Sequence, residues 1–198
     1  MLRLLPGHGK DDIMELNELL LKRRSCRKYA ASAEITEDEI LAVLSDTQQA
    51  ASWANSQSGR YYVALSDEAK KKVYDCLPPF NQGNTDGCSA YIIQTFVKGK
   101  AGFRDGVAAN APGNEWGAYD LGLATSYLML SATDRGYATL IMGVKDDDAI
   151  RAQFNIPEDE ELMAVISQRK QLNQKCNIHF QISKKKKPKG SLQPFLQY

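Results

Sequence analysis

The stretch from Glu115 to Arg135 constrains the fold most, because it predicts a long helix that is apolar nearly all round. Large side chains such as Leu121 and Leu128 surround small ones such as Gly122 and Ala124. A helix of this kind is stable only where it is buried, in a core or in a subunit interface. The chain must therefore cover this helix with its own layers, with a second copy, or with both.

The rest of the chain alternates between helical and strand patterns. Thr36 and Glu39 have the spacing of a capping box, and Ile35 and Ile40 can form the hydrophobic staple that accompanies it. Further helices are predicted over residues 11–22, 36–51, 66–76 and 146–154, strands over 61–65, 91–97, 137–142 and 161–167, and a long glycine-rich loop over 99–114. Because the elements do not form a regular parallel βαβ series, the sequence predicts an α+β fold with helices packed on a sheet.

Charge divides the chain into an acidic body and a basic end. Residues 168–198 hold eight of the 25 basic residues and no acidic residue, which leaves 17 basic against 24 acidic residues in the first 167 positions. We predict one domain over residues 1–167, followed by a basic tail or dimer-embracing extension over 168–198. A nucleic-acid-binding domain would carry its basic face on the fold itself, so nucleic acid is not predicted as a partner.

Several classes of protein are excluded by what the sequence lacks. No apolar run approaches the ~18 residues that span a bilayer, and the first ten residues do not have the pattern of a signal peptide. The four cysteines are scattered and only two histidines are present, so neither a disulfide framework nor a metal site is predicted. We expect a cytoplasmic protein without a membrane partner.

Arg23, Arg24 and Arg27 place three guanidinium groups, together with the Ser25 hydroxyl, directly after a predicted helix. Guanidinium groups bind phosphate through paired, charge-assisted hydrogen bonds. In an extended segment Arg23, Ser25 and Arg27 point the same way. The segment therefore predicts an anion-binding surface, and the alternative is a solvated run of charges.

Ser52, Asn55 and Gln57 form a second polar group, between the capped helix and the strand at Tyr61. Their hydroxyl and amide groups both donate and accept hydrogen bonds, which matches the edge of an isoalloxazine ring. The alternative is a helix-ending turn, which the same residue types favour.

Two shorter segments complete the set of candidate motifs. Asn81 follows a Pro–Pro break, and Met142 and Gly143 close a predicted strand. A strand that opens into a glycine turn exposes backbone N–H groups. Either segment is also compatible with an ordinary loop.

In this order, the motifs resemble those of the FMN-dependent nitroreductase family. The resemblance runs from about Leu20 to Ser167 and comprises Arg-Arg-Ser-x-Arg, Asn-Ser-Gln, Phe-Asn, the start of the long helix (residues 115–122), Leu-Ile-Met-Gly and Ile-Pro-Glu. It implies a nitroreductase-like fold with a mostly antiparallel central sheet. It also implies an intertwined homodimer in which each FMN contacts both chains.

The resemblance implies roles for the candidate residues toward FMN. Arg23, Arg24, Ser25 and Arg27 would bind the phosphate and ribityl region, and Ser52, Asn55 and Gln57 the ring and ribityl chain. Asn81 would reach the flavin from the partner subunit or from above the ring, and Met142 and Gly143 would present backbone N–H groups to it. The segments near positions 25 and 55 should then converge on one FMN. Phe103 and Arg104, in the glycine-rich loop, are predicted to gate and select the substrate.

Two departures from the family pattern stand out. Members usually carry Asn-x-Gln-Pro-Trp, whereas this chain continues after Gln57 with Ser58, Gly59 and Arg60, which changes the packing beneath the flavin and adds Arg60 as a candidate cation. After Ser167, members usually have a Gly-Tyr turn and a basic stretch that reaches the FMN phosphate. Here the run at 184–187 or Lys189 is a candidate replacement, and a disordered tail or a reading-frame change are the alternatives.

The predicted function is an FMN-dependent oxidoreductase that passes hydride from NADH or NADPH to a small planar acceptor by a ping-pong mechanism. The acceptor would be a nitroaromatic, a quinone or an enone. Because the cofactor carries this chemistry, no catalytic side chain is predicted, and the sequence offers no Ser/His/Asp or Cys/His arrangement. The alternatives are an FMN-storing protein with weak turnover, other flavin chemistry on the same scaffold, and a module whose tail binds nucleic acid.

Overall fold

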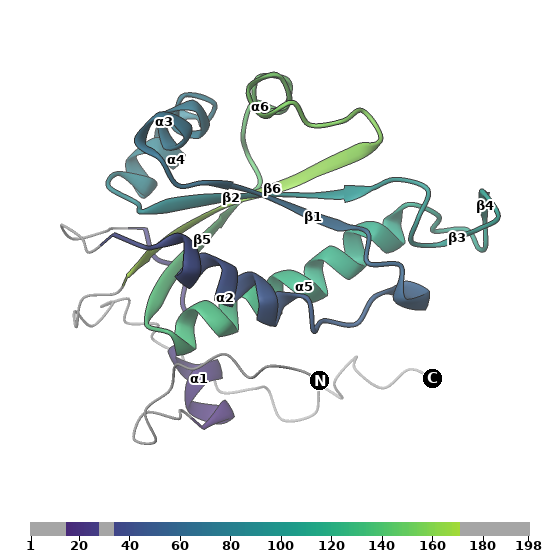
Figure 1. Cartoon of the computed structure of the whole chain (residues 1–198), viewed down its shortest axis with the longest axis horizontal. Helices are drawn as coiled ribbons and strands as arrows, with labels where there is room; N and C mark the ends of the chain where they lie inside the picture. The colour runs from purple at the N-terminus through teal and green to yellow at the C-terminus, as the bar shows by residue number, and fades with distance from the viewer. Residues whose placement is uncertain (1–14, 28–33, 171–198) are drawn as a thin grey trace, which may run out of the picture.

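A four-stranded antiparallel sheet separates two helical layers in the computed structural model, which describes residues 15–27 and 34–170 (Figure 1). Strands β1 (Gly59–Ala64), β2 (Ala90–Val97), β6 (Glu160–Lys170) and β5 (Tyr137–Met142) lie in the order β1-β2-β6-β5. Each neighbouring pair is antiparallel. The predicted α+β fold with an antiparallel central sheet is confirmed.

Helices α3 (Asp67–Asp75), α4 (Pro79–Thr85) and α6 (Asp147–Phe154) cover one face of the sheet (Figure 1). Val73 of α3 and Ile150 of α6 pack there against Ile93 and Val165, and all four side chains are fully buried. Removing each such side chain from water stabilises the fold by roughly 1.5–3 kcal/mol.

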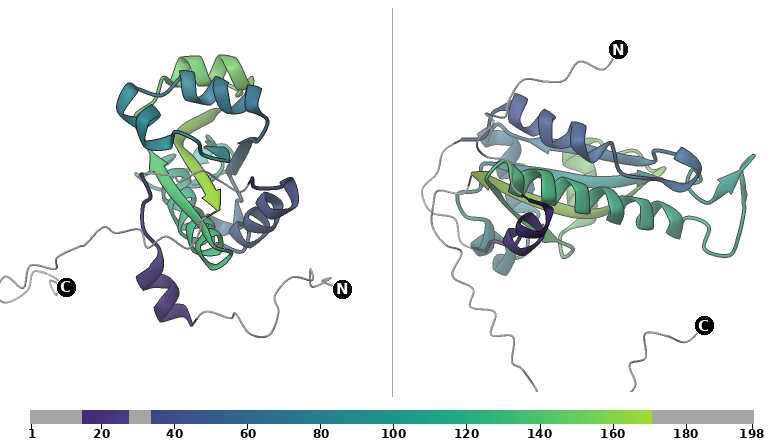
Figure 2. Two further views of the ribbon diagram at one scale, coloured as in Figure 1. Left: turned by 90° about the vertical axis from the view of Figure 1, so that its left-hand side faces the viewer. Right: turned by 90° about the horizontal axis from the view of Figure 1, so that it is seen from below.

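The opposite face is covered by α2 (Glu37–Thr47) and α5 (Glu115–Asp134), with α1 (Leu16–Lys22) lying against α5 farther from the sheet (Figure 2). Val43 and Leu128 pack against Ile92 and Ile166 of the sheet. Only one side of α5 is covered in this way, since Tyr119 and Tyr127 remain exposed. None of the described helices has both the length and the apolar character that crossing a membrane would require.

Local signals predict the start of α2 correctly. The Glu39 N–H donates to Thr36 Oγ1 at 3.3 Å, and the Thr36 N–H donates to the Glu39 carboxylate at 2.9 Å, which completes the predicted capping box. The helix ends at Thr47, before the predicted end at Ala51. Thr47 is its last buried residue, whereas Ala51 is exposed, so packing does not hold a further turn.

Three segments differ from their predicted conformation. The Pro–Pro break is followed by helix α4, because Pro79 occupies the first helical turn, where its missing N–H costs nothing. The glycine-rich loop contains the hairpin of β3 (Phe103–Arg104) and β4 (Val107–Ala108). Strand β6 continues to Lys170, three residues past its predicted end at Ser167. Predictions for the basic run at 184–189 lie outside the described residues.

We expect the free energy of unfolding to fall as the pH rises above about 9. Burial raises the pKa of the Cys88 thiol to about 11 and that of the Tyr61 phenol to about 12. Burial, followed by a hydrogen bond with Glu39, also raises the pKa of Tyr137. In the unfolded chain these groups lose their protons near their ordinary values of about 8.5 and 10. Above those values the folded state holds more protons than the unfolded state, so stability declines until the folded pKa is passed.

Urea unfolding between about pH 8 and pH 10.5 measures this decline. Cys88→Ala should flatten the part of the curve between about pH 9 and pH 10.5, because it removes one of the groups whose pKa is raised. A free energy of unfolding that stays constant over this range would contradict the prediction.

Candidate functional site

Residues Arg23–Arg27, here called the arginine segment, run in an extended conformation along the edge of β5. Ser25 pairs in parallel with Thr139, and the Cys26 N–H donates to the Thr139 carbonyl at 3.0 Å. Arg24 and Arg27 are exposed, Arg23 and Ser25 are half-buried, and Cys26 is buried. The sheet edge therefore fixes the backbone while most of the guanidinium groups face outward.

The turn Gly143–Lys145, here called the glycine turn, follows the end of β5 and contacts α4. Asn81 of α4 is buried, and its Nδ2 donates to the Val144 carbonyl at 2.9 Å. Thr139 precedes Met142 by three residues of the same strand, about 10 Å. The arginine segment, Asn81 and the glycine turn thus lie in one region, here called the first half-site.

Residues Ser52–Gln57, here called the amide turn, have a strained backbone. Ala54, Asn55 and Gln57 have positive φ angles of 45°, 55° and 48°, which residues with side chains seldom adopt and which cluster at functional sites. The Gln57 N–H donates to Ser52 Oγ at 3.1 Å, and Gln57 Nε2 donates to Asn55 Oδ1 at 3.1 Å. The predicted side chains thus hold one another in a fixed arrangement.

Asp120 anchors the amide turn to α5, a role that sequence reasoning missed. Its Oδ2 accepts the Trp53 N–H at 2.9 Å and the Ser56 hydroxyl at 3.4 Å. Burial raises the pKa of this carboxyl group, and the two hydrogen bonds oppose that rise. The signal in the sequence was an acidic residue on the buried side of an apolar helix.

Arg60, the candidate cation, donates to the carbonyls of Gln57 and Gly59 at 3.1 and 2.8 Å, so it also holds the amide turn.

A cavity of about 610 Å³ lies beside the amide turn, between the end of α2, β1 and α5. Its polar lining residues are Thr47, Gln48, Gln49, Ser52, Gln57, Ser58, Arg60, Tyr61 and Asp120. The cavity therefore offers donors and acceptors to a polar ligand.

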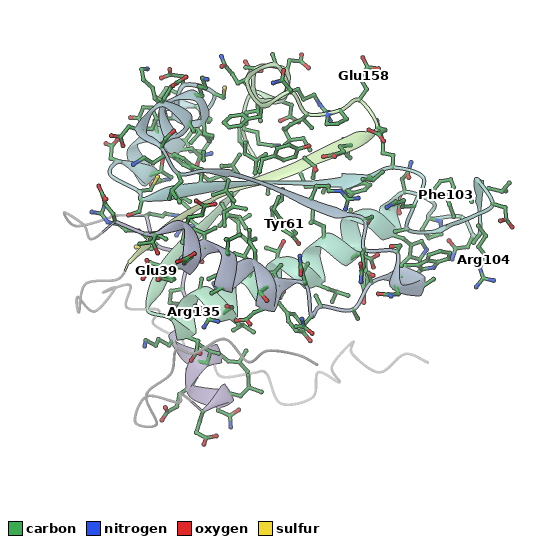
Figure 3. The ribbon with its side chains drawn as sticks, in the orientation of Figure 1. Glu39, Tyr61, Phe103, Arg104, Arg135 and Glu158 are labelled. Atoms are coloured by element: carbon green, nitrogen blue, oxygen red, sulfur yellow. The ribbon has the colours of Figure 1, made fainter. Side chains whose placement is uncertain are left out.

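The predicted gating residues lie in the β3–β4 hairpin, at the same end of the molecule as the amide turn (Figure 3). The Arg104 guanidinium lies 6.0 Å from the centroid of the Trp53 ring, within the range of a cation–π contact. The hairpin and the amide turn together form what is here called the second half-site. Within the described ranges, His, Cys, Asp and Glu side chains form no group of three suited to a metal ion.

The two half-sites do not meet within one chain. Asp120 holds the amide turn near the start of α5, whereas the arginine segment pairs with Thr139, just after the helix ends. The helix from Asp120 to Asp134 is about 21 Å long at 1.5 Å per residue. Figures 1 and 2 show α1 and the Trp53–Asn55 turn toward opposite ends of the long axis. The predicted convergence on one FMN therefore does not occur inside a single chain.

Comparisons with known proteins identify the family. The family model described as "Nitroreductase family" matches residues 20–167. YdgI of Bacillus subtilis (strain 168), named as an NAD(P)H nitroreductase, is 25% identical over 170 residues, which cover 72% of this chain and 81% of that protein. The CLA biosynthesis enone reductase of Lactiplantibacillus plantarum is 28% identical over 79 residues, which cover 40% of this chain and 36% of that protein.

A solved structure supports the same assignment. It shows a protein named as a nitroreductase, in complex with FMN, from Exiguobacterium sibiricum 255-15. The superposition has a TM-score of 0.71 and 25% identity, and covers 82% of this chain and 91% of that one. Since the family model matches about three quarters of the chain, including both half-sites and most of the sheet, the chain belongs to the nitroreductase family.

Proposed function

We propose that two copies of the chain bind FMN between them and use it to carry electrons from NADH or NADPH to a small planar acceptor. The observation that carries this proposal is the separation of two complementary half-sites by about 21 Å of helix. A symmetric dimer that places the first half-site of one copy against the second half-site of the other completes two identical sites. The family assignment supports an FMN-dependent NAD(P)H oxidoreductase.

The exposed apolar residues of helices α1 and α5 support a dimer. Helix α1 has seven residues and buries none of them, and Leu21 is 72% exposed. So short a helix is not stable in water without a packed face. Tyr119 and Tyr127 are exposed on one side of the neighbouring α5, eight residues apart. A second copy would cover both helices and would explain the apolar outer side of α5.

The residues of the first half-site fit the phosphate end and one edge of FMN. Arg23, Arg24 and Arg27 supply cations at the surface, and guanidinium groups suit a phosphate. In the described part of the chain, no backbone carbonyl accepts the N–H groups of Gly143 or Val144, both exposed. These groups are therefore available to acceptor atoms of a flavin, close to the place predicted for Met142 and Gly143.

The residues of the second half-site fit the ring and the ribityl chain. Ser52, Asn55 and Gln57 are preorganised by their mutual hydrogen bonds and by Asp120. Bound FMN would supply the capacity to accept two electrons from a nicotinamide and release them to an acceptor. Phe103 and Arg104 would border the acceptor's place, and the named activities of the relatives favour a nitroaromatic or an enone there.

We expect purified chain incubated with FMN to become yellow, to elute as a dimer and to bind two FMN per dimer. Addition of NADH or NADPH without oxygen should bleach the flavin absorption, and a nitroaromatic or an enone should restore it. Separate titrations with the two nucleotides measure which one is preferred. A folded dimer that binds no FMN would refute the proposal. A yellow dimer that neither nucleotide bleaches would instead indicate a flavin-storing protein.

A further inference from the structure

Lys145 is a nearly buried lysine at the glycine turn that no family motif in the sequence assigns. Only 3% of its side chain is exposed. Its Nζ lies 3.5 Å from the Gly143 carbonyl oxygen, 3.3 Å from the Met163 carbonyl oxygen and 2.9 Å from the Asp147 carboxylate. One ammonium group thus links the glycine turn to β6 and to the first turn of α6.

Two of the three carbonyls of the glycine turn, those of Gly143 and Val144, are contacted by side-chain donors from the protein side. The Gly143 carbonyl faces the Lys145 ammonium, and the Val144 carbonyl accepts Asn81 Nδ2 at 2.9 Å. The described chain contains no cis peptide bond, and in a trans peptide the carbonyl and the following N–H point in opposite directions. The N–H groups of Val144 and Lys145 must therefore point away from the two side chains.

The described structure supplies no backbone acceptor for these N–H groups. Successive N–H groups held outward form a concave surface that favours an anion or a partly negative acceptor atom. Two buried donors, from α4 and from the turn itself, thus determine the direction in which the turn can donate.

We propose that Lys145 is a positioning residue that holds the glycine turn with its N–H groups toward the bound flavin. This inference rests on the proposed function, because it assumes that FMN occupies the first half-site. The contacts would strengthen when the flavin gains negative charge on reduction, since hydrogen bonds to charged acceptors are roughly twice as strong. Lys145 would then stabilise reduced FMN more than oxidised FMN.

Lys145→Met removes the ammonium and keeps the length of the side chain. We expect the dissociation constant for oxidised FMN to rise about tenfold, which corresponds to loss of about 1.4 kcal/mol. A further tenfold loss for reduced FMN would lower the two-electron midpoint potential by about 30 mV. Fluorescence titration of flavin-free protein measures the first effect, and spectroscopic redox titration of the holoprotein measures the second. Lys145→Arg keeps the charge and should restore both values.

Lys71→Met is the matched control, because Lys71 lies on the exposed surface of α3 and is paired only with Asp75 in the described structure. It should leave FMN affinity and potential unchanged. If Lys145→Met lowers the melting temperature but changes neither value, Lys145 is merely structural and the inference is overturned. If that variant does not fold, Lys145→Gln replaces it, and an affinity and potential equal to wild type would overturn the inference. Wild-type protein that binds no FMN would refute the proposed function first, and the inference with it.

Discussion

We expect one FMN to bind to a heterodimer in which one chain lacks the arginine side chains and the other lacks the amide-turn side chains. The homodimer of either variant should bind no FMN. The reason is that a shared site takes its first half-site from one copy and its second half-site from the other. In the mixed dimer one site receives both damaged halves, and the other site receives both intact halves. If each chain formed its own site, the same heterodimer would bind nothing.

The two sets of substitutions can be chosen to leave the fold intact. Arg23→Ala and Arg27→Ala remove a half-buried and an exposed guanidinium from the first half-site. Each charge-assisted contact is worth about 1.5–3 kcal/mol, so the pair should weaken FMN binding at least about a hundredfold. In the second half-site, Asn55→Gly and Gln57→Gly are preferable to alanine, because both residues have positive φ angles that glycine adopts without strain.

The reciprocal mixture provides the control. A chain that carries all four substitutions, paired with an unmodified chain, should bind no FMN if the site is shared, because every site then contains one damaged half. It should bind one FMN if each chain binds its own. Coexpression with two affinity tags isolates each heterodimer, and the ratio of flavin absorption to protein concentration gives the stoichiometry. One FMN in this second mixture and none in the first would contradict the shared site.

Local structure was predictable because the signals that determine it lie within a few residues. The capping box of Thr36 and Glu39 marked the start of α2, and alternating or helical apolar patterns located the strands of the sheet and α5. The order of family motifs also selected the candidate residues that lie in the two half-sites. These local signals do not give the distance in space between the motifs.

That distance depends on how far the helices carry the chain. Helix α2 separates the arginine segment from the amide turn in the sequence, and its 11 residues alone advance the chain by about 16 Å. Asp120 and Lys145 were missed for a related reason. Each is a single charged residue that contacts a backbone group of another segment, so its role depends on tertiary contacts.

The end of β6 shows a second limit of prediction from the sequence, because polar residues there continue a buried strand. The strand was predicted to end at Ser167, since Gln168, Arg169 and Lys170 are polar. Instead, Gln168 pairs with Thr139 on β5 and with Ala90 on β2, and its side chain is fully buried. The part of the sequence that departs from the family pattern thus begins inside the sheet.

Gln168 is placed where an apolar side chain would stabilise the fold. Neither Nε2 nor Oε1 has a hydrogen-bond partner in the described structure. Strand alternation places its side chain on the same face as Ile166, which belongs to the core between the sheet, α2 and α5. An amide buried without partners costs about 1–3 kcal/mol by mutational data.

We therefore expect Gln168→Met to raise the free energy of unfolding by about 1–3 kcal/mol, because methionine has a similar length and no unsatisfied polar group. For a chain of this size, that gain corresponds to a rise in melting temperature of roughly 2–12 °C. Calorimetry or urea unfolding of flavin-free protein measures it without contributions from ligand binding.

Gln94→Met is the matched control for this gain. Gln94 is also buried in the sheet with an unpartnered Nε2, but its Oε1 accepts the Thr125 hydroxyl at 3.0 Å. Its replacement removes a hydrogen bond as well as an unsatisfied group, so the two effects should nearly cancel. A loss of stability in Gln168→Met would mean that the amide is hydrogen-bonded in solution. The partner would then come from residues outside the described ranges, from a buried water or from a second copy, and a partner from a second copy would bear directly on how the dimer is built.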